Sequence, residues 1–207
     1  MWSAYPLHLP KLSYQLCQEL LSFAKTFILN QAYDPNQEMS DQDWAAFYEF
    51  HKQTNSTTST YKTFQLPFEL QQKIKNELAD QVFPFDKFDI GVQYITSGDR
   101  LVTHRDAGRT LNLIYNLTGD NSITEFYNKK IQDEHRYVFH LEELEGPTEV
   151  HCFEKDQWVV FNNQQVHSVI NNNKSRIALT VNIDATFDQF IDYFSSKNLI
   201  DLTYKPL

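Results

Sequence analysis

The sequence RIALTVNI, residues 176–183, alternates strictly between small or polar side chains and aliphatic ones. Successive residues of a β-strand point to opposite faces of the sheet, so the aliphatic residues share one face and the others share the second face. The second face comprises Arg176, Ala178, Thr180 and Asn182. The aliphatic face is suited to packing beneath helices, and the pattern therefore predicts a strand whose other, polar face is turned into a closed sheet.

Further short alternating strands are expected from Phe88 to Ile183, with helices on either side of them. Helical spacing of apolar residues predicts helices at residues 12–30, 41–52, 67–82 and from 188 onward. The polar stretch at 55–60 is expected to be a loop. Together these elements predict a mainly β fold with N-terminal helices (α+β), whose core is a double-stranded β-helix, or jelly roll.

Length and charge limit the domain organisation and the partners. With 207 residues, 14% of them aromatic, the chain is long enough for one domain with a sizeable core. We expect a single domain over 1–207, with mainly helical support at 1–87, the jelly-roll core at 88–184 and a C-terminal helix and tail at 185–207. A net charge of −9 and a pI near 5.2 argue against a nucleic-acid partner, because phosphate binding draws on basic patches.

The cysteines and apolar runs bear on location. Two cysteines, Cys17 and Cys152, are too few and too far apart to indicate a disulfide framework. The first residues lack a charged segment before an apolar core, which argues against a secretory signal, and no apolar run reaches the length of a transmembrane helix. We therefore expect a cytoplasmic protein without a membrane partner.

Three candidate metal ligands occur in the order His104, Asp106, His167. His104 and Asp106 are two positions apart, and on a strand over 101–106 their side chains would project together into one cavity. His167 follows the apolar run 158–161, where a neighbouring strand of a closed sheet would bring it to the pair. Two imidazoles and one carboxylate on one face form an arrangement that leaves coordination positions open on Fe(II) for a co-substrate and dioxygen.

An anion anchor follows the third ligand. Arg176 lies nine positions beyond His167 (176 − 167) and belongs to the polar face of its strand. A guanidinium inside a barrel needs an anionic partner, because an unpaired buried charge is very costly. A dicarboxylate co-substrate would supply that partner, with one end on the metal and the far carboxylate paired with Arg176 and assisted by the Thr180 hydroxyl.

These residues resemble the 2-oxoglutarate- and Fe(II)-dependent dioxygenases, and within them the prolyl-4-hydroxylase-like branch, over residues 88–184. Members of that branch carry a Tyr ten positions before the first metal His, which Tyr94 matches (104 − 94). They also carry an Arg or Lys after the second His, followed four positions later by Thr or Ser, which Arg176 and Thr180 match.

Two neighbouring stretches extend the resemblance. Residues 110–117 resemble the strand after the first ligands, and Thr124-Glu125-Phe126 resembles the Thr-x-Phe strand that follows it. Two departures concern the substrate: Asn121-Ser122 replaces the paired glycines usual before Thr-x-Phe, and Asn116 stands where prolyl hydroxylases often have a second co-substrate-binding Tyr.

The resemblance implies a site and its chemistry. Fe(II) would be held by His104, Asp106 and His167, with 2-oxoglutarate and dioxygen as co-substrates and ascorbate allowed as a reductant. The residues that the resemblance implies at the co-substrate are Tyr94, Arg176 and Thr180. Asn112 and Asn116 share the inward parity of their own strand with Ile114, and we expect them to contact the co-substrate or the substrate. Asp106 implies hydroxylation rather than halogenation, because related halogenases vacate that ligand position. The leading substrate is a prolyl residue in a peptide or protein, followed by a free amino acid.

Other classes of protein also use some of these residues. His104-Arg105-Asp106 would also begin a protein-kinase catalytic loop, but position 111 is Leu where that loop needs Asn. A zinc hydrolase could use the same three ligands, but it leaves Arg176 unexplained. Nucleic-acid or small-molecule oxygenases of the same superfamily, and a jelly-roll binding module with a relict site, stay open. No ligand role is expected for His135, His140 or His151, and Arg109 is expected to be a solvated loop charge.

Overall fold

The computed structural model describes residues 1–30, 62–78, 88–95, 100–101, 103–106, 110–118, 122–128, 137–171 and 175–207. Over these residues the strands are β1 (Ala4–Leu7), β2 (Lys62–Gln65), β3 (Phe88–Ile95), β4 (Leu111–Asn116), β5 (Ile123–Tyr127), β6 (Glu149–Cys152), β7 (Trp158–Asn162), β8 (Val166–Ile170) and β9 (Arg176–Ile183). The helices are α1 (Tyr14–Asn30), α3 (Phe68–Leu78), α4 (Phe187–Ser196) and a short 3-10 turn, η2 (Leu141–Glu143).

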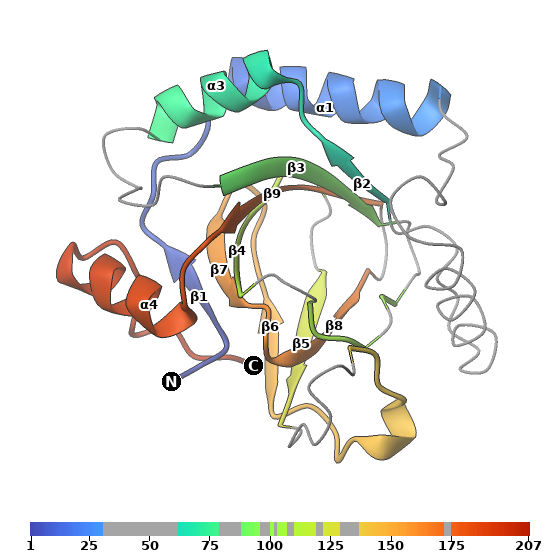
Figure 1. Cartoon of the computed structure of the whole chain (residues 1–207), viewed down its shortest axis with the longest axis vertical. Coiled ribbons are helices and arrows are strands. Elements are labelled where there is room, and N and C mark those ends of the chain that lie inside the picture. Colours follow the sequence, from blue (N-terminus) through green and yellow to red (C-terminus); the bar gives the residue numbers. More distant parts are fainter. Residues whose placement is uncertain are drawn as a thin grey trace.

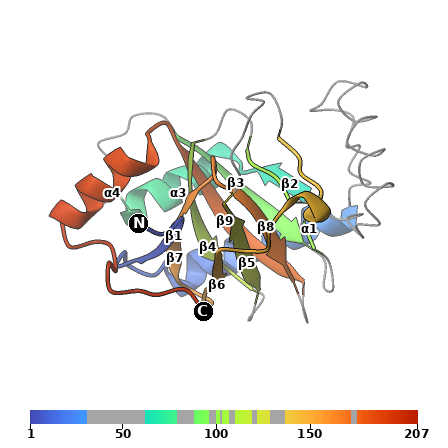
Figure 2. The same cartoon turned by 90° about the horizontal axis from the view of Figure 1, so that it is seen from below.

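The strands form two facing antiparallel sheets. The larger sheet has the order β1-β7-β4-β9-β3-β2 and the smaller has the order β6-β5-β8. Figure 1 shows the smaller sheet beneath the curved larger sheet, and α1 and α3 side by side above the larger sheet. Figure 2 shows the same arrangement from below. The predicted mainly β fold with a jelly-roll core and N-terminal helices is confirmed.

The two faces of the larger sheet have different chemistry, as the alternation in β9 predicts. The aliphatic residues of β9 join the main core between this sheet and the helices, and they comprise Ile177, Leu179, Val181 and Ile183. From α1 the same core receives Leu16, Leu20 and Ala24, which recur every fourth residue along one helix face. The opposite face of the sheet looks toward the smaller sheet, where Ala178 packs with Phe126 and Phe161. The polar face of β9 therefore lines the space between the sheets.

The helix α4 docks on this core at the C-terminal end of the chain. Thr186 caps it: its hydroxyl accepts a hydrogen bond from the Gln189 N–H, and the Gln189 side chain accepts one from the Thr186 N–H. Phe190 and Phe194 are fully buried and stack with ring centroids 3.9 Å apart. The predicted terminal helix is thus present and held by packing as well as by its cap.

Phe190→Ala should lower the free energy of unfolding by roughly 3–5 kcal/mol, because it removes a fully buried aromatic side chain and leaves a cavity. Chemical denaturation would measure the change. Asp192→Asn, on the exposed face of the same helix, is the matched control and should change stability little. A loss at Phe190 no larger than that of the control would contradict the packing described for α4.

The N-terminal region contributes two strands as well as the helices α1 and α3. β1 pairs with β7 and β2 pairs with β3, so both edges of the larger sheet come from residues before 88. Each strand has four residues, too few for alternation to be recognised. Pro6 lies in β1, at an edge position where a missing N–H is tolerated.

Two of the remaining predicted elements are present in the structure. The helix expected at 12–30 is α1, and the helix expected at 67–82 is α3 as far as residue 78. The helix at 41–52 and the loop at 55–60 lie outside the described residues. No helix in the described ranges combines the length and apolarity needed to cross a bilayer.

Candidate metal centre

His104 and His167 are joined through their backbones. The His104 N–H donates to the His167 carbonyl at 2.9 Å, and the His167 N–H donates to the His104 carbonyl at 2.7 Å. His167 belongs to β8, whereas His104 forms only isolated bridges. This reciprocal pair fixes two imidazoles from distant parts of the sequence on adjacent backbones.

The strand expected over 101–106 is not formed in the described part of that segment, and this corrects the prediction. The described residues of the segment make only isolated bridges, with β8 on one side (Arg100 to Ile170 and His104 to His167) and with Val138 on the other, and the Asp106 N–H donates to the Asn163 carbonyl. Bridges that are isolated in this way do not form a continuous ladder. Asp106 nevertheless returns to the side of His104.

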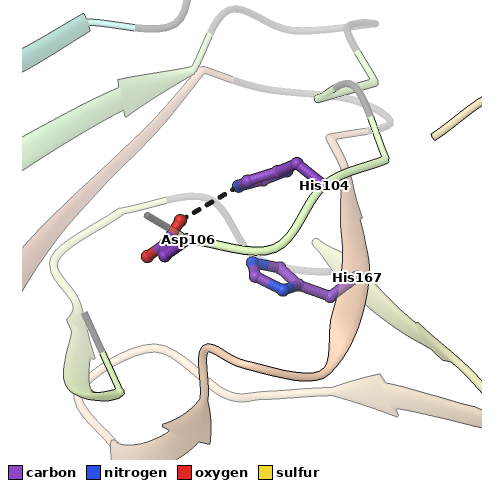
Figure 3. Close-up of side chains that lie close together, drawn as sticks. All are labelled: His104, Asp106 and His167. Carbon is purple, nitrogen blue, oxygen red and sulfur yellow. Dashed lines mark ion pairs between the residues drawn. The ribbon is translucent and has the colours of Figure 1, made fainter. Parts of the chain in front are cut away.

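The three side chains converge (Figure 3). His104 Nε2 lies 3.4 Å from Asp106 Oδ1, and the His104 and His167 ring centroids are 4.4 Å apart. One ligand atom from each of the three residues lies within 4.8 Å of the others. Two ligand atoms at right angles around an ion with bonds of about 2.1 Å are roughly 3 Å apart. The His104–Asp106 pair is close to that separation, and small side-chain rotations would bring His167 to it.

The hydrogen bonds around His167 select its ligating nitrogen. Nδ1 lies 2.9 Å from the backbone carbonyl of Gln165, so Nδ1 carries the proton and Nε2 presents a lone pair toward the other two ligands. The ring of Phe126 packs against the imidazole with centroids 5.7 Å apart. A fixed tautomer and a packed ring favour a preorganised metal ligand.

Asn163 holds the carboxylate, and sequence reasoning did not identify it. Its side-chain amide donates to Asp106 Oδ2 at 2.7 Å, while its backbone carbonyl accepts from the Asp106 N–H at 2.9 Å. Asn163 is buried in the turn between β7 and β8. An amide in a turn gives no periodic signal, so only the three-dimensional contact shows this role.

Asn163→Ala should weaken Fe(II) binding roughly 10–100-fold, as expected when the hydrogen-bonding partner of a metal ligand is removed. Titration of the metal-free protein with Fe(II) without oxygen would measure the change. The neighbouring Asn162→Ala removes a turn hydrogen bond, to the Gln164 N–H, without touching a ligand and is the matched control. Equal affinities for the two variants would show that Asn163 does not support the centre.

A strip of buried polar side chains lines the inner face of the larger sheet. The Arg176 Nε donates to Asn116 Oδ1 at 3.0 Å, and the Thr180 hydroxyl donates to Asn112 Oδ1 at 2.6 Å. All four residues are at most 3% exposed. The structure therefore brings together Arg176, Thr180, Asn112 and Asn116, with the two asparagines bonded to the other two residues.

Tyr94 does not join this strip, and this corrects its expected place at the co-substrate. It pairs with Ile177 across β3 and β9, and directly opposed residues share a face, so Tyr94 lies on the helix side of the sheet. Its hydroxyl donates to the Ser175 hydroxyl at 3.3 Å. The neighbouring Gln93, opposite Ala178, occupies the inner face instead and is half-buried.

The other residues considered as ligands or substrate contacts lie away from the metal centre or outside the described residues. His151 is fully buried, with Nδ1 3.1 Å from the Tyr204 hydroxyl and Nε2 3.0 Å from Glu149 Oε2. Within the described ranges, the His104, Asp106 and His167 group is the one cluster of His, Cys, Asp or Glu side chains spaced to hold a metal ion. Arg109 and His135 lie outside the described residues.

Comparison with known proteins gives likenesses of fold. No family model matches the chain, and no curated protein sequence matches it. Among solved structures, YcfD from Escherichia coli is 14% identical with a TM-score of 0.43, covering 63% of this chain and 36% of its own. A Pseudomonas putida prolyl-4-hydroxylase is 16% identical with a TM-score of 0.41, covering 88% and 91%.

A cupin 2 conserved barrel domain protein from Rhodopseudomonas palustris is 10% identical with a TM-score of 0.33, covering 51% of this chain and 57% of its own. The chain spans about a third of the length of YcfD, 36% of it. The fold and the candidate metal centre therefore rest on the residues of this chain.

Proposed function

We propose that this protein is an Fe(II)- and 2-oxoglutarate-dependent dioxygenase that hydroxylates an unactivated C–H bond. The observation that carries the proposal is the convergence of His104 and Asp106, from residues 103–106, with His167 of β8, fixed by the backbone pair His104–His167 and by the bond from the Asp106 N–H to Asn163. Two nitrogens and one carboxylate oxygen suit Fe(II) and leave positions for two further ligands. The buried guanidinium of Arg176, on the inner face of β9, distinguishes this arrangement from a bare metal site.

In this proposal His104, Asp106 and His167 hold the iron. The bound iron and 2-oxoglutarate supply the oxidation, which consumes dioxygen, gives succinate and carbon dioxide, and delivers one oxygen atom to the substrate. Gln165 keeps the proton of His167 on Nδ1, and Asn163 keeps Asp106 oriented. Phe126 packs against the His167 imidazole and would shield that ligand from water.

The polar strip supports the co-substrate role. Arg176 has five N–H donors in a planar fork, and Asn116 accepts the one on Nε, which fixes the plane of the guanidinium. Such a fork binds a carboxylate through two parallel hydrogen bonds. Thr180 and Asn112 provide a hydroxyl and an amide on the same face. We assign these residues to the far carboxylate of 2-oxoglutarate, with ascorbate as an external reductant.

The proposed substrate is a prolyl residue of a peptide or protein, or a free amino acid. This follows from the sequence resemblance to the prolyl-4-hydroxylase-like branch and from the net charge of −9, which disfavours nucleic acid. A cytoplasmic location belongs to the same proposal, since the free thiols of Cys17 and Cys152 and a resident Fe(II) both suit a reducing compartment.

Incubation with Fe(II), 2-oxoglutarate, ascorbate and separate pools of peptides, amino acids and oligonucleotides tests this function. Succinate formation together with a mass gain of one oxygen atom in the peptide or amino-acid pool is the expected result. Turnover only with methylated oligonucleotides, with release of formaldehyde, would support the iron- and 2-oxoglutarate-dependent oxidation but would show that the substrate is a nucleic acid. No succinate with any pool or without substrate would reject the proposed function, and would leave the zinc hydrolase or the relict binding module.

A further inference from the structure

A cavity of roughly 370 Å³ opens at the end of the barrel where β7 passes into β8. Two carboxylates, from Glu149 and Asp188, and the exposed aromatic side chain of Trp2 line it, and amide side chains including Gln165 complete the wall. None of the described residues around this cavity is a Lys, Arg or His, but Met1, which carries a positive α-amino group, also lines it. The cavity therefore combines negative charge with aromatic surface.

The cavity adjoins the candidate metal centre. Gln165 lines the cavity, and its backbone carbonyl also accepts the hydrogen bond of His167 Nδ1. Phe126 is the register partner of Glu149 on one side and of His167 on the other, so all three share the inner face of the smaller sheet. With neighbouring strands about 4.8 Å apart, the Glu149 and His167 backbones are roughly 10 Å apart.

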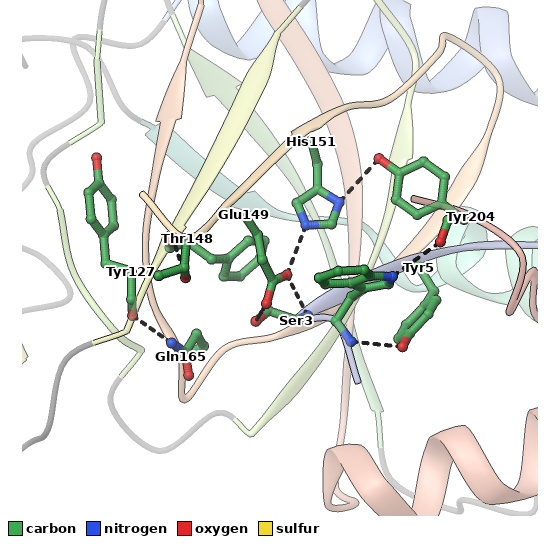
Figure 4. Close-up of polar contacts among 10 residues, drawn as sticks. Ser3, Tyr5, Tyr127, Thr148, Glu149, His151, Gln165 and Tyr204 are labelled. Carbon is green, nitrogen blue, oxygen red and sulfur yellow. Dashed lines mark hydrogen bonds and ion pairs between the residues drawn. The ribbon is translucent and has the colours of Figure 1, made fainter. Parts of the chain in front are cut away.

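Glu149 is held as a charged group. Its Oε2 accepts from the Ser3 N–H at 2.7 Å and lies 3.0 Å from His151 Nε2, and its Oε1 accepts from the Ser3 hydroxyl at 2.9 Å (Figure 4). Burial would raise the pKa of this carboxyl, but the hydrogen bonds from His151 and Ser3 outweigh burial and lower the pKa. A carboxylate has about four lone-pair sites, so Glu149 retains capacity to accept from a ligand.

Three contributions determine the sign of the charge at the cavity: the two carboxylates, the N-terminus of α4 and the α-amino group of Met1. Phe187 and Asp188 begin α4, and a helix N-terminus carries about half a positive charge. The Thr186 capping box already satisfies part of that end. Two carboxylates carry about two negative charges, against about one positive charge on the α-amino group of Met1 and about half a charge at the helix end, so the cavity keeps a small net negative charge and favours a cation over an anion.

We propose that this cavity binds a lysine or arginine side chain of a peptide substrate, about three residues away from the residue that is oxidised. The inference rests on the proposed function and names its substrate class. An extended peptide advances about 3.3 Å per residue, so three residues span the roughly 10 Å between the metal ligand His167 and Glu149. The exposed ring of Trp2 covers the aliphatic stem of such a side chain, while Glu149 and Asp188 pair with its charged end.

The test is calorimetric binding of capped nine-residue peptides that have a central proline and one lysine at each position from one to four residues away on either side. The same peptides with acetyl-lysine are the neutral counterparts. We expect the peptides with lysine about three residues away to bind roughly 3- to 10-fold more tightly than their acetylated counterparts, and the difference to shrink at high salt.

Variants of α4 locate the effect. Asp188 and Asp192 are both exposed on this helix, but only Asp188 lines the cavity. Asp188→Lys should abolish the preference for lysine, Asp188→Asn should reduce it, and the matched control Asp192→Asn should retain it in full. Equal binding of lysine and acetyl-lysine peptides by the unmodified protein, or an undiminished preference in Asp188→Lys, would overturn the proposal.

The measurement separates this inference from the proposed function. Conversion of 2-oxoglutarate to succinate in the absence of peptide reports the iron chemistry alone. Such turnover without any lysine preference would reject the cavity as a cation pocket and keep the dioxygenase. A lysine preference lost in Asp188→Lys, in a protein without 2-oxoglutarate turnover, would support the cavity as a basic-peptide site and reject the proposed function.

Discussion

His167→Ala is expected to abolish stoichiometric Fe(II) binding. His167 is one of three converging ligands, and the two that remain, His104 and Asp106, cannot define a facial site. The loss should exceed the roughly 10–100-fold expected for a supporting residue such as Asn163. Anaerobic titration with Fe(II), followed by metal analysis of the desalted protein, would measure it.

A buried histidine outside the metal centre controls for loss of packing. His151 is fully buried and bonded to Glu149 and Tyr204, so His151→Ala removes an imidazole of comparable burial without removing a ligand. It should retain one Fe(II) per chain. Stoichiometric binding by His167→Ala, or the same loss in both variants, would contradict the assignment of His167.

Arg176→Ala is expected to raise the 2-oxoglutarate concentration needed for half-maximal turnover by roughly 30- to 4,000-fold. Removing one partner of a buried charge pair costs roughly 2–5 kcal/mol, which corresponds to this range. Arg176 is 3% exposed and lies on the inner face with Thr180. Steady-state succinate formation at varied 2-oxoglutarate would give the value, with thermal unfolding measured in parallel because the variant also loses the hydrogen bond to Asn116.

Arg176→Lys is the matched variant for this prediction. It retains the charge but loses the planar fork, so its requirement for 2-oxoglutarate should lie between those of the unmodified protein and Arg176→Ala. An unchanged requirement in both variants would show that a different cation anchors the co-substrate.

Much of the fold could be predicted from periodicity. The strict alternation of β9 assigns its aliphatic residues to the helix side and Arg176 and Thr180 to the interior, and the structure has them there. The apolar spacing of α1 likewise indicates the face that packs on the sheet. The four-residue strands β1 and β2 could not be predicted, because their pairing depends on contacts with distant strands.

The sequence predicts the side on which a site residue lies where the spacing between two residues determines it. The prediction is less secure where the register between two strands determines that side. His104 and Asp106 return to the same side although no regular strand forms between them, because separate segments bind each backbone. Tyr94 shows the opposite case: its ten-residue spacing to His104 matches the resemblance, but register with Ile177 places it on the helix side. A shift of one residue exchanges the two faces, so Gln93 takes the inner position.

The central claim is that the three-ligand centre and Arg176 together bind iron with a chelating keto acid. Anaerobic addition of Fe(II) and then 2-oxoglutarate to the metal-free protein, followed by visible absorption, tests it most directly. We expect a weak charge-transfer band that saturates at one Fe(II) and one 2-oxoglutarate per chain, and that is absent from His167→Ala. Tight Fe(II) binding without such a band at saturating 2-oxoglutarate would contradict the claim.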